Sequence, residues 1–96
     1  MVILNVFFDV KQEHETEFRK LLHGMVIESN KEAGCEHYEL MQHTATPGTY
    51  ALIEHWSTQE ELDAHGKTEH WKHFDRTVNN YLEAPYSEHH YSEIAF

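Results

Sequence analysis

Residues 2–10 divide with a period of two into an apolar side and a mixed side. One side of this segment is entirely apolar and consists of Val2, Leu4, Val6, Phe8 and Val10. A period of two with many β-branched and aromatic residues predicts a β-strand over residues 2–10. The other side carries Ile3 and Phe7 together with Asn5 and Asp9. Because large apolar residues lie on both sides, we expect both faces of this strand to be covered.

The apolar period becomes helical over residues 11–33. Five apolar residues at spacings of three and four share one side of this predicted helix, namely Phe18, Leu21, Leu22, Met25 and Val26. Gly34 is expected to end the helix. An extended pattern over residues 35–43, the turn sequence Thr46-Pro47-Gly48 and a second extended segment over residues 50–56 predict a β-hairpin.

A second helical region follows the hairpin and is interrupted in its middle. Ser57 or Thr58 can cap its first part, which ends near Gly66. Thr68 can cap its second part, and Pro85 ends that part. The apolar stripe of the second part consists of Trp71, Phe74, Val78 and Tyr81 or Leu82.

The predicted order of elements is β-α-β-β-α-β, with residues 86–94 as the last strand. It indicates one domain over residues 1–96, of the α+β class, with a four-stranded antiparallel sheet in the ferredoxin-like arrangement. Helices in this arrangement cover one face of the sheet and leave the other exposed. Because that other face is also apolar in the first strand, we expect a second copy of the chain to pack against it, giving a homodimer.

Charge and cysteine content narrow the possible partners and compartments. Seven basic and seventeen acidic residues give a formal net charge of −10. This balance opposes binding to nucleic acid and to anionic membrane surfaces. The single cysteine, Cys35, cannot form an intrachain disulfide, and the N-terminal segment has neither the features of a signal peptide nor the length of a membrane span. We expect a cytoplasmic protein.

The segment from the predicted third strand to the broken helix has a distinctive pattern. Its residues Glu54, Trp56, Leu62, His65, His70 and Phe74 follow the spacing E-x-W-x5-L-x2-H-x4-H-x3-F. Upstream, residues 32–40 (EAGCEHYEL) place a helix-ending Gly-Cys before the second strand. Over nearly its whole length the chain resembles the antibiotic biosynthesis monooxygenase family, and within it the small, quinol monooxygenase-like proteins.

The resemblance implies a dimeric α+β barrel with an apolar pocket between sheet and helices in each subunit. It also implies an oxidoreductase without metal, flavin or other cofactor, in which a small aromatic substrate such as a quinol donates electrons to dioxygen, the co-substrate. Two alternatives stay open, because fold alone does not settle function. One is an isomerase or degradation enzyme for a small oxygenated metabolite, and the other is a non-catalytic dimeric ligand-binding or stress protein.

Two polar residues are candidate catalytic groups. His65 follows Leu62 by three positions, so it is expected to face inward on the same side of the short helix. Its imidazole is suited to act as a base at neutral pH, although an inward histidine can also be structural. Asn5 interrupts an apolar strand face and matches an asparagine of the family's haem-degrading branch. It can bond to water or backbone, or it can donate to a substrate oxygen or to reduced dioxygen.

Six further residues are expected to shape a substrate pocket, namely His70, Glu54, Trp56, Trp71, Phe74 and Tyr38. His70 can alternatively bond to a backbone carbonyl that the helix break leaves free. Glu54 needs a partner because an unpaired buried charge is costly, and we expect that partner to be a histidine. The four aromatic residues are core residues by default and can also form a wall that holds a flat aromatic substrate.

The many histidines raise the question of a metal site. His65 and His70 could chelate across the helix break, but zinc generally needs three or four ligands and the sequence indicates no third one. His89 and His90 are adjacent on a strand and must point to opposite faces. The haem-degrading branch has its axial histidine at the position of Asp75 in this chain. We therefore expect no metal site.

Overall fold

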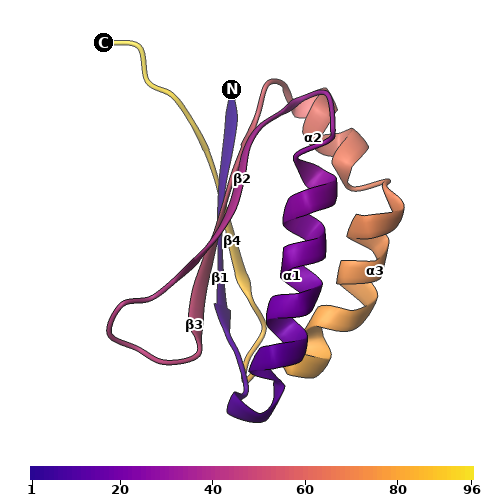
Figure 1. Ribbon diagram of the computed structural model, residues 1–96. Coiled ribbons are helices and arrows are strands. Elements are labelled where there is room, and N and C mark those ends of the chain that lie inside the picture. The colour runs from indigo at the N-terminus through magenta and orange to yellow at the C-terminus, as the bar shows by residue number, and fades with distance from the viewer.

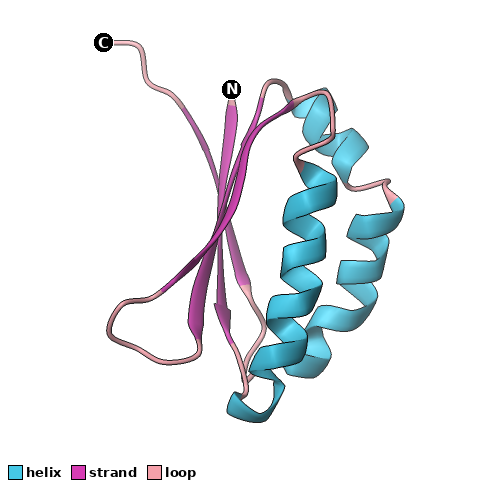
Figure 2. Ribbon diagram, viewed as in Figure 1, coloured by secondary structure: helices cyan, strands magenta, loops and turns pink.

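The computed structural model describes residues 1–96 and consists of a sheet and a layer of helices on one of its faces (Figure 1; Figure 2). The strands are β1 (Val2–Asp9), β2 (Cys35–Gln42), β3 (Thr49–Trp56) and β4 (Ser87–Ser92), all paired antiparallel in the order β2-β3-β1-β4. This is the predicted ferredoxin-like α+β arrangement. The last strand is shorter than the predicted range 86–94.

The helical layer consists of α1 (Glu15–Ser29), α2 (Gln59–His65) and α3 (Glu69–Thr77), with the short 3₁₀ turns η1 (Gln12–His14) and η2 (Val78–Tyr81). Thr58 caps α2 by accepting a hydrogen bond from the Glu61 N–H at 3.1 Å. Thr68 caps α3 in the same way, accepting from the Trp71 N–H at 3.2 Å. The predicted break at Gly66 is confirmed. No helix of the chain is both long enough and apolar enough to cross a membrane.

The first helix ends earlier than predicted, so that residues 30–33 form a turn. The Asn30 side chain donates to the backbone carbonyl of Val26 at 2.8 Å and to that of Tyr38 at 3.1 Å. It thereby competes with helical hydrogen bonding and ties the end of α1 to β2. The prediction of a helix through residue 33 is therefore wrong.

Gly34 has a different role from the helix stop that the sequence predicted. Its carbonyl accepts from the backbone N–H of Ser57 at 2.9 Å, which joins the turn after α1 to the start of the second helical region. A side chain at this position would collide with the side chain of Glu61 on α2. Glycine is thus needed here for the close approach of two segments.

The two faces of the sheet differ sharply in burial. The helix-facing side of β1 carries Leu4, Val6 and Phe8, each at most 3 % exposed. On the opposite side, Phe7 is 43 % exposed and Met41 is 45 % exposed. Figure 1 shows that no element of the chain covers this outer face. The packing of a second copy of the chain on this face stays a prediction.

Candidate functional site

An open cleft of about 580 Å³ lies between the sheet and the break in the second helical region. Its lining includes Glu54, Glu88 and His90 from the sheet and Leu62, His65 and Trp71 from the helices. A small cavity of about 30 Å³ shares Glu54, Glu88 and Trp71 with the cleft and extends the hollow to Tyr38 and Phe74. The chain therefore has a hollow between sheet and helices, where the resemblance implies one. Only 3 of the 11 residues that line the larger cleft are hydrophobic, so it is not the apolar pocket that was expected.

His65 is held on several sides at the end of α2 and is only 2 % exposed. Its ring packs against Trp56, with 4.5 Å between centroids, and against Tyr38 at 5.6 Å. Its Nδ1 lies 2.7 Å from Oε2 of Glu32. Burial lowers the pKa of His65, while the hydrogen bond and the charge of Glu32 oppose that shift. The neutral ring would donate from Nδ1 to the carboxylate and leave Nε2 able to accept a proton.

Glu32 joins the two histidines of the sequence motif. The same Oε2 atom that contacts His65 also lies 2.7 Å from Nε2 of His70, in the first turn of α3. The Glu32 side chain is 16 % exposed, and that of His70 is 20 % exposed. One carboxylate oxygen thus accepts from two imidazoles that belong to different helices.

Glu32 is not among the site residues predicted from the sequence. Residue 32 was expected to lie in the last turn of a helix, and it is 33 positions away from His65 along the chain. The sequence feature that could have pointed to Glu32 is its position at the start of segment 32–40, which resembles the family. The early end of α1 and the turn that follows are what present Glu32 to the two histidines.

Glu54 is a second buried carboxylate beside the cleft, and it is 4 % exposed. Its Oε1 accepts a hydrogen bond from the indole Nε1 of Trp56 at 3.0 Å. Burial, together with the nearby charges of Glu88 and Glu32, raises the pKa of Glu54 to about 7, although the indole hydrogen bond opposes this shift. The predicted histidine partner is wrong, because the neutral indole two residues along the same strand face supplies the hydrogen bond.

The aromatic residues divide between the core and the hollow. Trp56 is fully buried beneath His65 and does not line the cleft. Tyr38 and Phe74 are buried at the small cavity, and Trp71 is half-buried and lines both hollows. Burial raises the pKa of Tyr38 well above its ordinary value, so its hydroxyl stays protonated near neutral pH. Trp71 is therefore the aromatic side chain best placed to contact a ligand in the open cleft.

Asn5 lies apart from this cleft. In the sheet register it is paired with Ile53 and His89, and it shares the outer face with Phe7. Successive residues of a strand point to opposite faces, and the cleft-lining Leu4 is its neighbour. The structure thus does not bring Asn5 and His65 into one pocket within a chain, contrary to what their pairing as catalytic groups requires.

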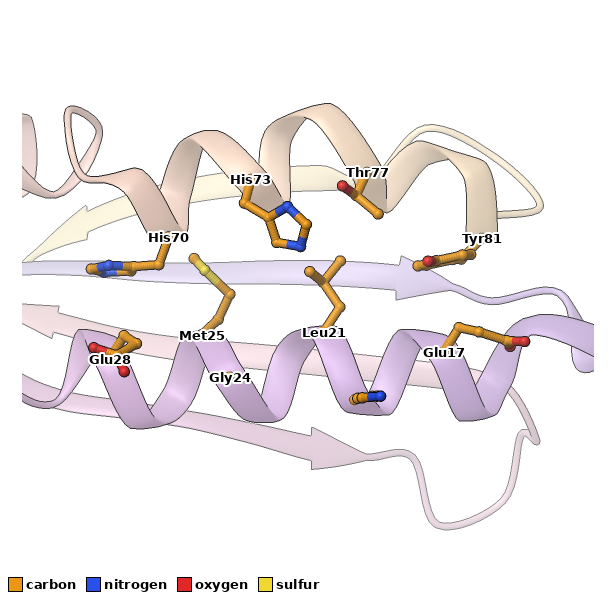
Figure 3. Close-up of a pocket in the computed structure, with 10 residues that line it drawn as sticks. Glu17, Leu21, Gly24, Met25, Glu28, His70, His73, Thr77 and Tyr81 are labelled. Carbon is orange, nitrogen blue, oxygen red and sulfur yellow. The ribbon is translucent and has the colours of Figure 1, made fainter.

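A second hollow, of about 550 Å³, opens between α1 and α3 (Figure 3). Leu21 and Met25 line it from α1, and His70 and His73 face it from α3. His70 therefore contacts Glu32 and also borders this groove. The groove lies on the helical layer and is separate from the cleft that His65 lines.

Comparison with known proteins shows the family of the chain. The family model described as antibiotic biosynthesis monooxygenase matches residues 1–77. The chain belongs to this family. A curated relative from Bacillus subtilis (strain 168), "Putative monooxygenase YcnE", is 27 % identical over 85 residues, which are 88 % of this chain and 90 % of that protein.

Solved structures of related proteins share the antibiotic biosynthesis monooxygenase fold. A family member from Nitrosomonas europaea superposes with a TM-score of 0.92 at 22 % identity and covers 99 % of this chain and 100 % of its own. A conserved protein from Methanosarcina mazei Go1 gives a TM-score of 0.93 at 25 % identity, over 97 % of this chain and 92 % of its own. These likenesses agree in fold and leave the substrate to be argued from the site.

Proposed function

We propose that the protein is a monooxygenase that oxidises a small quinol or a related electron-rich aromatic compound with dioxygen, without metal or flavin. Membership of the antibiotic biosynthesis monooxygenase family supports the reaction class. The observation that carries the proposal is the arrangement of His65. Its Nδ1 is engaged by Glu32, its Nε2 forms no hydrogen bond within the chain, and the residue lines a cleft of aromatic-ligand size.

His65 acts as the base in this proposal. Its Nε2 accepts the proton of a phenolic hydroxyl, and the resulting anion gives up an electron to dioxygen more readily than the neutral quinol does. Glu32 is a positioning residue, since it holds the proton on Nδ1 and so keeps Nε2 in its basic form. This is the role that a carboxylate commonly has beside a catalytic histidine.

The overall reaction balances without a further oxidant or reductant. A quinol and O₂ give a hydroxyquinone and water. The ring loses two electrons when the quinone forms and two more when the new C–O bond replaces a C–H bond, and these four electrons reduce dioxygen. One oxygen atom enters the ring and the other leaves as water, so no flavin or metal is required as an electron carrier.

The rest of the cleft supports an aromatic substrate of modest size. Trp71 offers a face for stacking, and Tyr38 and Phe74 make the inner end apolar. Glu54 exchanges a proton near neutral pH, because the pKa of its buried carboxyl is raised to about 7. In this proposal it binds a substrate hydroxyl at the sheet side of the cleft, opposite the helices.

We also propose a homodimer in which the outer faces of two sheets pack together. The large apolar side chains Phe7, Met41 and Tyr91 are 43–50 % exposed on this face, and a domain of this size gains stability by covering them. A second copy fits because the same patch is self-complementary across a two-fold axis. The unpaired Cys35, whose pKa burial raises to about 11, fits a reducing compartment such as the cytoplasm.

Oxygen consumption by purified, chelator-treated protein against a panel of quinols tests the proposal. We expect uptake above autoxidation, a loss of about 100-fold or more in His65→Ala and little change in the control His37→Ala. Normal turnover by His65→Ala would refute the assignment of the base. An absence of uptake with every quinol would refute the monooxygenase, and aromatic binding without turnover would then favour a ligand-binding protein.

A further inference from the structure

Three potential metal ligands meet at one point behind the cleft. A carboxylate oxygen of Glu32, a ring nitrogen of His65 and a ring nitrogen of His70 all lie within 4.8 Å of one another. They come from the turn after α1, the end of α2 and the first turn of α3. We propose that these three residues form a binding site for a divalent transition metal of the zinc class.

The expectation of no metal site rested on the sequence offering only two ligands, His65 and His70, at the helix break. That premise is wrong, because the fold brings Glu32 to the same point from a distant part of the chain. Two imidazoles and one carboxylate match the three protein ligands that many zinc enzymes use, with a fourth position left for water or another ligand. The set is unsuited to Ca²⁺ and Mg²⁺, which prefer oxygen ligands throughout.

The geometry allows a metal ion to take the place of the two hydrogen-bonding protons, each of which moves to the other nitrogen of its own ring. In the structure, Oε2 of Glu32 lies 2.7 Å from each imidazole nitrogen, as expected for hydrogen bonds. Ligand bonds to zinc are about 2.0–2.2 Å long, so the donor atoms must separate by a few tenths of an ångström to hold the ion between them. The side chains of Glu32 and His70 are partly exposed, and small rotations of these two achieve that separation.

A single threonine fixes the spacing of the two histidines. The Thr68 hydroxyl donates to the backbone carbonyl of His65 at 2.8 Å and accepts from the Trp71 N–H at 3.2 Å. It therefore ties the end of α2 to the first turn of α3, on which His70 lies. Ligands on rigid elements lose little freedom when a metal binds, which favours affinity.

The groove between α1 and α3 gives the ion a route from solvent. His70 lines this groove, which has a volume of about 550 Å³, and Figure 3 shows its ring at one end, close to Glu28 and Met25. His65 is buried on the other side of Glu32. The metal would thus arrive from the helical face, while an aromatic substrate would enter the cleft on the opposite side of the His65 ring.

Metal binding has a consequence for the proposed reaction, and this part of the inference rests on the proposed function. When a metal binds Nδ1 of His65, the single ring proton moves from Nδ1 to Nε2, so that Nε2 can no longer accept one. Zinc would therefore inhibit oxygen uptake and a chelator would restore it. The same three residues would support the base when they hold protons and block it when they hold a metal.

The direct test is a Zn²⁺ titration of metal-stripped protein in competition with a chromogenic chelator. We expect one tight equivalent per chain and a rise in the melting temperature on zinc addition. Glu32→Gln and His70→Ala should each weaken this binding by roughly 100-fold or more, since even the loss of a group behind a ligand costs about 10–100-fold. Circular dichroism would establish that each variant is folded.

A matched control comes from the pair His37 and His55, whose rings lie 5.0 Å apart on the outer face of the sheet. His37→Ala should still bind one equivalent of Zn²⁺ tightly and should lose only weak binding of Zn²⁺ at the surface. Tight binding that survives both Glu32→Gln and His70→Ala, or zinc affinity no greater than that of the surface histidines, would overturn the proposed site. Because binding is read without substrate, failure of the oxygenase assay would leave this result independent.

Discussion

Two carboxylates near His65 differ in burial and in their partners: the side chain of Glu32 is 16 % exposed, and Glu54 is 4 % exposed. Glu32 accepts hydrogen bonds from two imidazoles at 2.7 Å, each of which can also carry a positive charge. Glu54 accepts one hydrogen bond, from the neutral indole of Trp56 at 3.0 Å. The first carboxylate contacts two imidazole rings, whereas the second has a single donor and lies between core residues and a cleft that Glu88 also lines.

The difference shows that partners, more than burial alone, decide what a carboxylate does. An ionised group needs compensating donors or charges when it leaves water, and Glu54 has too few of them. Its pKa therefore rises to about 7, and it becomes a group that gains and loses a proton under ordinary conditions. Glu32 instead lies within 2.7 Å of two ring nitrogens, an arrangement suited to orienting an imidazole or binding a cation.

The largest effect is expected from breaking the cluster of Glu32, His65 and His70. Glu32→Ala removes the acceptor shared by His65 and His70, so the tautomer of His65 is no longer fixed. In metal-stripped protein we expect the rate of quinol-dependent oxygen uptake to fall by about 100- to 1,000-fold, with the protein still folded. Uptake by Glu32→Ala at the wild-type rate would contradict the positioning role of Glu32. In that case, loss of uptake in folded His65→Ala would still identify His65 as the base.

The next effect should come from removing the one donor to Glu54. Trp56→Phe leaves that carboxylate without a hydrogen bond and shrinks a fully buried side chain. We expect unfolding to require about 3 kcal/mol less free energy, from the lost hydrogen bond and the cavity together. Urea unfolding at pH 8 and pH 5 measures this, with the larger loss at pH 8, where Glu54 is ionised. An equal loss at both pH values would mean that only packing changed.

Neutralising Glu54 should stabilise the protein in a pH-dependent way. The pKa of Glu54 is about 7 in the folded chain and 4.5 in its ordinary state. As the pH rises between these values, the unfolded chain ionises first, so the wild type loses stability over that window and does not regain it above pH 7. Glu54→Gln escapes this loss and should be more stable by on the order of 2 kcal/mol at pH 8. Thermal melts should show this gain shrinking towards pH 4.5. A constant gain across the range would exclude titration of Glu54 as its cause.

The smallest effect is expected for an exposed version of the same pair. His37 Nε2 lies 3.1 Å from Glu39 on the outer face, with side chains 40 % and 52 % exposed. Water screens such a pair, so His37→Ala should change the free energy of unfolding by less than about 0.5 kcal/mol. The measurement is made at low salt, where a surface ion pair has its largest effect. A loss of clearly more than about 1 kcal/mol would contradict the view that water screens this exposed pair.

Most of the fold could be predicted from the sequence because its apolar periods are clear. The alternation in β1, the helical stripe of α1 and the break at Gly66 each reflect a local rule that the tertiary structure obeys. The end of α1 could not be predicted in this way, since the Asn30 side chain bonds to a carbonyl of β2 that is remote until the chain folds. Propensity alone favoured a longer helix.

The candidate site was only partly predictable for a related reason. His65 was expected to face inward because its spacing from Leu62 is local information. Its partner Glu32 could not be found by spacing, because a contact across 33 residues depends on how the two layers pack. For Asn5, the alternation along the strand shows which residues share its face. It does not show which face of the sheet borders the cleft, because that depends on where the helices pack.

The cluster of Glu32, His65 and His70 also has a meaning for folding. Its contacts join residues 33 and 38 positions apart, so closing them requires the loop formed by the whole β2–β3 hairpin to be in place. Contacts of such range form only when non-local pairing is largely complete. The chemistry of the site is therefore absent from any fragment that lacks Glu32, and a peptide spanning α2 and α3 would carry both histidines without their shared carboxylate.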